Sequence, residues 1–168
     1  HFIANTSLRT EYASNGEWIL VPQINLSYQL NQLQLRASAG YAYRNADFTE
    51  LYNNYNRIGI RSGSIGNPNL NPVIIHSIEL GLLKYWKKSS FMFTAFYRRE
   101  NAPTERISFV DEFSIVRTLP VNLQYQNSYG LETNFSLNWA KWWKTSLNNN
   151  LFMSEIYGEY KGIEYQNK

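Results

Sequence analysis

Apolar and polar residues alternate with a period of two along most of this chain. In residues 33–44 the apolar positions are Leu33, Leu35, Ala37, Ala39, Tyr41 and Tyr43, and polar or small residues lie between most of them. Such alternation is typical of a β-strand with one apolar and one polar face. It predicts seven strands, at residues 2–12, 18–30, 33–44, 73–85, 90–99, 122–139 and 143–156. The chain is therefore predicted to be all-β and antiparallel.

The connections between these strands are expected to differ at the two strand ends. Tight turns are predicted at residues 31–32, 86–89 and 140–142, and long loops at 45–72 and 101–121. The second loop contains two strand-like pieces, 107–110 and 113–118, which are expected to form a hairpin with Asp111 and Glu112 at its tip. Residues 158–168 are expected to begin another loop. Short turns at one end and long loops at the other are typical of a transmembrane β-barrel.

Aromatic residues gather at both ends of the predicted strands. The end with tight turns carries Tyr28, Tyr85, Trp86, Trp139, Trp142 and Trp143, and the other carries Trp18, Tyr41, Tyr43, Tyr125 and Tyr129. Rings with an apolar body and a polar tip favour membrane interfaces. The whole chain is 16% aromatic and 17% charged, which fits a barrel better than a typical cytosolic domain. The apolar face is therefore predicted to meet lipid and the polar face a wet lumen.

A sheet of this kind cannot end inside a membrane. Each unpaired amide in hydrocarbon costs several kcal/mol, so an open edge needs a partner strand. The predicted strands are therefore expected to form part of a larger barrel. The sequence begins in strand-like residues without a signal layout, and we expect export to be encoded upstream.

Composition and motifs do not favour catalysis, nucleic-acid binding or a metal site. The 168 residues contain no cysteine and carry a formal net charge of +3, with basic residues scattered singly or in pairs. His76 shares the outward parity with Ile78, which disfavours a general base. The loop glycines Gly59, Gly63 and Gly66 lack the strand-to-helix context of a phosphate cradle. We therefore expect no enzyme activity, no cofactor and no nucleic-acid partner.

Four motifs in order resemble the barrel of TonB-dependent outer-membrane receptors. They are Gly40-Tyr41-Ala42-Tyr43-Arg44, Glu50-Leu51-Tyr52, Gly66-Asn67-Pro68-Asn69-Leu70-Asn71-Pro72 and Glu79-Leu80-Gly81. The family pattern has an acidic residue after the second proline, where this chain has Val73. The richness in Asn and Tyr is similar to the Bacteroidetes branch of that family.

The resemblance implies that residues 1–168 are a partial barrel of about 22 strands in total, without its plug domain or C-terminal strand. It implies an outer-membrane receptor that imports a scarce nutrient such as a siderophore, cobalamin or a glycan. Implied partners are outer-membrane lipid, the protein's own plug, and the inner-membrane TonB complex through the missing N-terminal part.

The candidate functional residues fall into three groups. Side chains expected to face the lumen, and to contact the plug or water, are Arg36, Arg44, Glu79 and Glu132. Loop residues expected to cap a ligand from outside are Phe48, Tyr52, Tyr55, Arg57 and Arg61, since rings and guanidinium groups bind chelates and sugars. Motif residues expected to hold the loop on the barrel rim are Glu50, Leu51, Tyr52, Gly66, Asn67, Pro68, Leu70 and Pro72. Among these, Gly66 supplies backbone freedom and the prolines stiffen the descent into the next strand.

Two other protein classes fit parts of the pattern. One is a complete eight-stranded outer-membrane barrel with a structural or adhesive role, which needs one more strand. The other is a soluble β-sandwich that binds carbohydrate. In a sandwich, Leu33, Leu35, Leu131, Phe135 and Leu137 would be packed beneath a second layer.

Overall fold

The computed structural model describes residues 1–13, 16–52 and 56–167, with only the backbone described for residues 56–58. Two sheets make up the fold. The larger, which we call the wall, consists of β1 (Phe2–Tyr12), β2 (Trp18–Leu30), β3 (Leu33–Arg44), β6 (Val73–Tyr85), β7 (Ser89–Asn101), β10 (Tyr125–Ala140), β11 (Trp143–Tyr160) and β12 (Ile163–Asn167). The smaller, which we call the loop-end sheet, consists of β4 (Asn56–Gly59), β5 (Ser62–Ser64), β8 (Thr104–Val110) and β9 (Val116–Asn122). One short helix, α1 (Phe48–Leu51), precedes β4.

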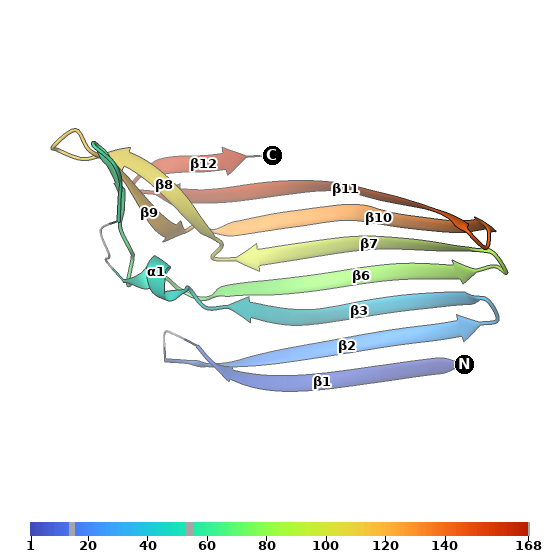
Figure 1. Cartoon of the computed structure of the whole chain (residues 1–168). Coiled ribbons are helices and arrows are strands. Elements are labelled where there is room, and N and C mark those ends of the chain that lie inside the picture. Colours follow the sequence, from blue (N-terminus) through green and yellow to red (C-terminus); the bar gives the residue numbers. More distant parts are fainter. Residues whose placement is uncertain (14–15, 53–55, 168) are drawn as a thin grey trace.

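The wall is an antiparallel sheet whose strands follow one another in chain order, β1-β2-β3-β6-β7-β10-β11-β12 (Figure 1). All seven predicted strands are present, and their bounds differ from the predicted ones by a few residues. The predicted loop at residues 158–168 is wrong. There β11 continues to Tyr160, and Lys161 and Gly162, both with positive φ, form a two-residue turn into an eighth strand, β12. That short strand offers too little alternation to be recognised in the sequence.

The apolar face of the wall is a single exposed layer. Strand register places its residues side by side, with Leu35 opposite Leu82 and Leu131 opposite both Ala95 and Leu151. Leu35 and Leu131 are each 44% exposed and Phe135 is 37% exposed. The sandwich hypothesis needs these side chains buried, so the structure contradicts it.

The wall also does not close on itself. In the described part of the chain, β1 pairs with β2 and β12 pairs with β11, and the two edge strands do not pair with each other. A complete eight-stranded barrel would require that pairing. The structure therefore contradicts the hypothesis of a complete small barrel.

The polar face of the wall is hollowed. One hollow of about 380 Å³ is lined by residues of β1, β2, β3, β6 and β7, including Asn25, Arg36 and Glu79. A second of about 390 Å³ is lined by residues of β6, β7, β10 and β11, including Glu79 and Glu132. The polar side chains thus lie on the concave side, where a barrel has its lumen.

The two ends of the wall differ as the loop lengths predict. Short connections join β2 to β3, β6 to β7 and β10 to β11 at one end, on the right of Figure 1, and the loop-end sheet and α1 lie at the other. The hairpin β8–β9 confirms the predicted one, with Asp111 at its tip. It contributes Ile107 and Val121 to a buried cluster with Leu123, which packs against Ile156 of the wall. Among the described residues, no helix has the length and apolar character needed to cross a bilayer.

Candidate functional site

The first loop leaves the wall through α1, whose N-terminus is closed by a capping box. Asp47 Oδ1 accepts from the Glu50 backbone N–H at 2.8 Å, and Glu50 Oε2 accepts from the Asp47 backbone N–H at 3.0 Å. The Thr49 hydroxyl donates to Asp47 Oδ1 at 2.7 Å. These hydrogen bonds, the one from Thr49 first and the one from the Glu50 backbone next, lower the pKa of Asp47 below its ordinary value. The reciprocal bonds fix a helix that is too short to form by itself.

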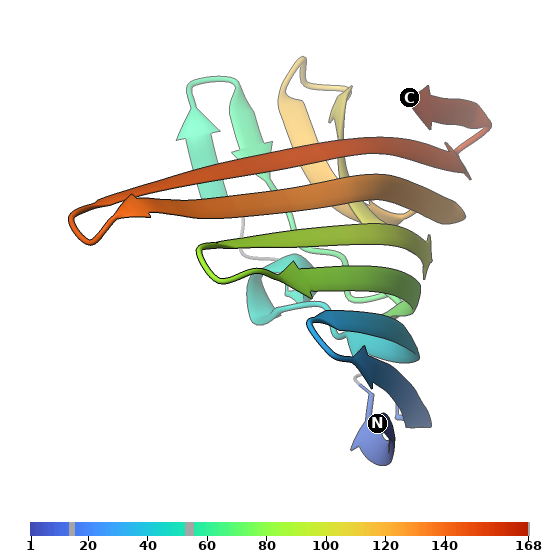
Figure 2. The same cartoon turned by 90° about the vertical axis from the view of Figure 1, so that its right-hand side faces the viewer.

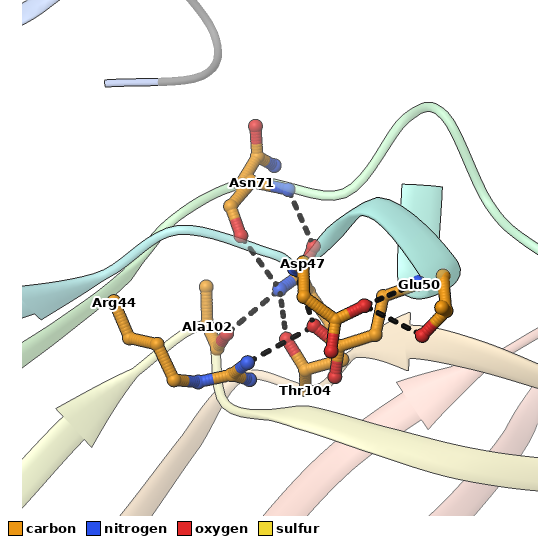
Figure 3. Close-up of polar contacts among 8 residues, drawn as sticks. Arg44, Asp47, Glu50, Asn71, Ala102 and Thr104 are labelled. Carbon is orange, nitrogen blue, oxygen red and sulfur yellow. Dashed lines mark hydrogen bonds and ion pairs between the residues drawn. The ribbon is translucent and has the colours of Figure 1, made fainter. Parts of the chain in front are cut away.

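Arg44 ties the end of β3 to this helix. Its Nη1 lies 3.0 Å from Glu50 Oε2, so one carboxylate serves both the capping box and an ion pair (Figure 3). We predicted from strand parity that Arg44 contacts the plug or water in the lumen. The structure places its guanidinium against Glu50, at the junction of wall and loop, and leaves the side chain 46% exposed. The contact with plug or water stays a prediction.

Gly66 brings the descending part of the loop against α1. A Cβ at Gly66 would collide with the backbone carbonyl of Tyr52, so only glycine allows this approach. The next residue continues the contact, since the Asn67 N–H donates to the Glu50 carbonyl at 2.7 Å. The Glu50-Leu51-Tyr52 and Gly66-Asn67 motifs are thus in direct backbone contact.

Asn67 and Leu70 shape the return to β6. The Asn67 side chain accepts from the Asn69 N–H at 3.0 Å and donates to the Pro120 carbonyl of β9 at 3.0 Å. Leu70 is 4% exposed and Val73, the first residue of β6, is 2% exposed. The stretch containing Pro68 and Pro72 is therefore held by the buried side chains of Leu70 and Val73 and by the hydrogen bond from Asn67 to the second loop.

Asn122, at the end of β9, joins the two loops and was missed in the sequence. Its Oδ1 accepts from the Asn71 N–H at 2.7 Å, and its Nδ2 donates to the carbonyl oxygens of Asn71 at 3.1 Å and Ala102 at 2.7 Å. Figure 3 shows these partners beside the capping box. A second junction is the parallel pairing of β5 with β9. The two long loops consequently form one continuous structure over the loop end of the wall.

The structure brings together only some of the predicted ligand-capping residues. Phe48 and Tyr52 are 65% and 53% exposed, and their ring centroids are 4.5 Å apart. Arg61 is exposed in the turn between β4 and β5, which Figure 2 shows at the far end of that hairpin from α1. Tyr55 and the side chain of Arg57 lie outside the described residues. An aromatic pair is present, and Arg61 is not part of it.

The other lumen candidates are on the concave face, as parity predicts. Arg36 and Glu79 line the first hollow, and Glu79 and Glu132 line the second. Arg98 and Glu100 also line the second hollow and were missed. Extending the alternation of β7 past Tyr97 would have found them.

Two aromatic rings interrupt this polar face. Phe96 and Phe152 are both opposite Gly130 in the strand register. A Cβ added at Gly130 would come within 2.8 Å of a ring atom of Phe96 and of the Cβ of Phe152. Phenyl rings on neighbouring strands can cover a glycine that has no side chain of its own. This packing explains why Phe96 departs from the polar pattern.

Comparison with known proteins gives one family and a set of similar folds. The model of the outer membrane protein beta-barrel family matches residues 3–168. A search of curated proteins found no match. None of these results bears on the Bacteroidetes-like style, which stays a prediction.

Several solved structures contain a similar sheet. The siderophore receptor PirA from Pseudomonas aeruginosa has a TM-score of 0.76 at 17% identity, covering 94% of this chain and 34% of that one. The copper transporter OprC has a TM-score of 0.65 at 16% identity, covering 83% of this chain and 21% of that one. A double mutant of the Serratia marcescens hemophore receptor HasR, in complex with HasA and heme, has a TM-score of 0.57 at 12% identity, covering 98% and 39%. This chain spans about a third of the length of the first of these receptors.

Proposed function

This chain belongs to the outer membrane protein beta-barrel family, and from that premise we propose that it is part of the barrel of a TonB-dependent transporter. It lies in the outer membrane of a Gram-negative bacterium. The whole protein would import a nutrient too large or too scarce for simple diffusion, such as a siderophore, cobalamin or a glycan. Its barrel would consist of about 22 strands.

The observation that carries this proposal is a wall that is amphipathic and open at both edges. Its outer face is apolar and exposed, its concave face is polar, and β1 and β12 lie at opposite edges of the sheet. In hydrocarbon both edges require further strands. A barrel of about 22 strands has a lumen wide enough for a plug.

The proposed roles of the lumen residues follow from this arrangement. Arg36, Glu79 and Glu132 would contact the protein's own plug domain or the water around it. Arg44 and Glu50, which are engaged with each other, would hold the first loop in place. The wall would stay fixed while the inner-membrane TonB complex moves the plug, and no covalent chemistry would occur in this chain.

The first loop would supply an outer contact for the ligand. Phe48 and Tyr52 offer two adjacent exposed rings, and ring faces bind chelates and sugars. Tyr55, Arg57 and Arg61 remain predicted ligand contacts. The motif residues Leu51, Gly66, Asn67, Pro68, Leu70 and Pro72 would act as the scaffold beneath.

Uptake by intact cells tests the function. A strain lacking the protein would be given labelled ferric siderophores, cobalamin and glycans, with and without a proton uncoupler. We expect one ligand class to enter only when the protein is present and the membrane is energised. Uptake that persists in the presence of uncoupler, or the absence of any ligand that depends on the protein, would contradict the proposal.

A double variant and a control then test the loop contact. The double variant Phe48→Ala/Tyr52→Ala should weaken binding of the imported ligand about tenfold, since stacked rings contribute roughly 0.5–1.5 kcal/mol each. Phe113→Ala, a similarly exposed ring at the tip of the β8–β9 hairpin, serves as the control. Equal affinities of both variants and the wild type would exclude α1 from the ligand site.

A further inference from the structure

A row of polar side chains crosses the apolar, outer face of the wall near its loop end. His76 is opposite both Tyr41 and Arg99 in the strand register, and Arg99 is also opposite Asn127. Asn127 is in turn opposite Glu155. We call Tyr41, His76, Arg99, Asn127 and Glu155 the outer polar row. It runs over β3, β6, β7, β10 and β11.

The row directly below, toward the middle of the strands, is apolar or aromatic. It consists of Ile78, Tyr97, Tyr129 and Met153, all exposed. The next positions, Leu80, Leu131 and Leu151, are exposed aliphatic side chains. The outer polar row therefore marks the height at which the membrane-facing surface changes from apolar to polar.

Arg99 is the unusual member of this row. A lipid-facing arginine costs about 2–4 kcal/mol at the bilayer midplane and about 0–1 near the interface. Arg99 is opposite His76, above the tyrosine row, and so lies at the interface. Its cost there is small, and its charge is available to the lipid headgroups.

The contacts of Arg99 hold its guanidinium in place. The guanidinium carbon lies 4.6 Å from the ring centroid of Tyr125, and Nε donates to Asn101 Oδ1 at 3.3 Å. Asn101 Nδ2 is 3.1 Å from His76 Nε2, and the His76 ring packs edge-on against Tyr41 with centroids 4.3 Å apart. Among the described residues, Arg99 donates its hydrogen bond to Asn101 through Nε. The two terminal amino groups of the guanidinium can therefore reach an external acceptor.

Charge along the row is not uniform. Glu155 lies on β11, two strands from Arg99, and separated from it by Asn127. Asn127 is itself engaged, because Oδ1 accepts from the Tyr97 hydroxyl at 3.0 Å. An anion is therefore favoured at the β6–β7 side of the row, around His76 and Arg99, and disfavoured at the β11 side.

We propose that Arg99, supported by His76, Asn101 and Tyr125, binds the headgroup phosphate of a lipid in the outer leaflet. A planar guanidinium fork matches two phosphate oxygens, and a stacked fork loses little freedom on binding. The acyl chains would lie over Ile78, Leu80 and Leu131, immediately below. This continuous apolar surface distinguishes a lipid from a free phosphate ion. The inference needs only the outer-membrane location, and stands apart from the transport proposal.

The test uses the intact barrel, purified in non-ionic detergent and stripped of lipid. Native mass spectrometry would count bound molecules of diphosphorylated lipid A and of its dephosphorylated form. The variants are Arg99→Gln and Arg98→Gln, which remove the same charge from neighbouring residues on opposite faces of β7. Arg99→Lys, which keeps the charge without the fork, provides a third variant. A change in electrophoretic mobility on heating would show that each barrel is folded before heating.

We expect Arg99→Gln to weaken binding of the phosphorylated lipid about tenfold, as loss of a charge-assisted hydrogen bond implies. Arg98→Gln should bind like the wild type, and Arg99→Lys should fall between. The dephosphorylated lipid should bind the wild type as weakly as the phosphorylated lipid binds Arg99→Gln. Equal effects of the two Gln variants, indifference to the lipid phosphate, or full displacement by millimolar inorganic phosphate would each overturn the proposal.

Discussion

The wall and the loop-end sheet are stabilised by different interactions. The wall carries long backbone ladders, yet most of its large apolar side chains are exposed, Leu80 at 58% among them. The buried apolar side chains of the described chain are all in the half that carries the loops: Ala13, Val21, Ala46, Leu70, Pro72, Val73, Pro103, Ile107, Pro120, Val121 and Leu123. The loop end therefore contains the internal core, and the wall needs lipid to cover its apolar face.

The polar ties follow the same division. Asn122, Asn67 and the Arg44–Glu50 pair connect separate segments at the loop end through side chains. On the wall, side-chain hydrogen bonds mostly join neighbouring strands that the ladder already holds, as between Asn134 and Asn148. Changes in the wall should therefore act on insertion of the whole barrel, and changes at the loop end should act locally.

The largest expected effect comes from placing a charge on the lipid-facing side. Leu80→Arg should destabilise the intact barrel by about 2–4 kcal/mol, because the charge lies in the middle of the apolar band. Thr94→Arg, on the concave face near Glu79 and Glu132, should stay within about 0.5 kcal/mol of wild type. Urea unfolding in lipid vesicles measures both. Equal destabilisation would mean that the two faces do not meet different solvents.

This same contrast explains what the sequence could predict. Residues 33–44 alternate for about a dozen positions and residues 77–82 for six. Each of these positions reports the solvent on its face, so the wall was predictable. The loop end was not. Its helix has four residues and β5 has three, too few for any period. The β5–β9 pairing joins segments about 50 residues apart, and no short-range sequence pattern predicts it.

The site residues divide in the same way. Arg36, Glu79 and Glu132 were placed on the concave face by parity alone. The ion-pair partner of Arg44 could not be predicted, because it depends on the direction in which the chain leaves β3. Gly66 was recognised as a residue that needs freedom, whereas the reason, close backbone contact with Tyr52, exists only in the folded loop.

The next largest effect concerns that contact. Gly66→Ala should strain the loop by roughly 1–3 kcal/mol, as overpacking does, and separate Asn67 from Glu50. Hydrogen exchange at the Asn67 amide should speed up while the wall amides keep their protection. Gly81→Ala on the wall is the matched control, since its nearest neighbour to an added Cβ is an ordinary 3.5 Å away. Unchanged exchange at Asn67 in Gly66→Ala would refute the close contact.

A smaller loss is expected at the link between the two loops. Asn122→Ala removes the acceptor for the Asn71 amide and the donor to Ala102, at a local cost of about 1–3 kcal/mol. Asn134→Ala removes an exposed side-chain bond on the wall, and should cost within about 0.5 kcal/mol. Hydrogen exchange at the Asn71 amide and urea unfolding should distinguish Asn122→Ala from Asn134→Ala. If Asn71 stays protected, Asn122 does not join the loops.

The smallest effect is a dependence on pH at α1. The pKa of Asp47 is lowered in the fold by the bonds from Thr49 and Glu50. Its contribution to stability is therefore present above the ordinary carboxyl pKa of 3.8 and is lost as pH falls through the lower folded value. Protection of the Glu50 amide, corrected for intrinsic exchange, should fall in that acidic window. Asp47→Asn, which keeps a capping oxygen, should remove this component; an identical acid response in both proteins would contradict the assignment.

Neighbouring residues on each wall strand should face lipid and water alternately. Residues 1–168 contain no cysteine. In an intact barrel from which any other cysteine has been removed, single cysteines would be placed at each residue from 129 to 135 on β10 and labelled with bimane. Quenching by brominated lipid should be strong at 129, 131, 133 and 135 and weak at the residues between, with quenching by an aqueous agent in the opposite phase. Quenching without a two-residue period, or lipid quenching on neither face, would show that the wall does not separate lipid from water.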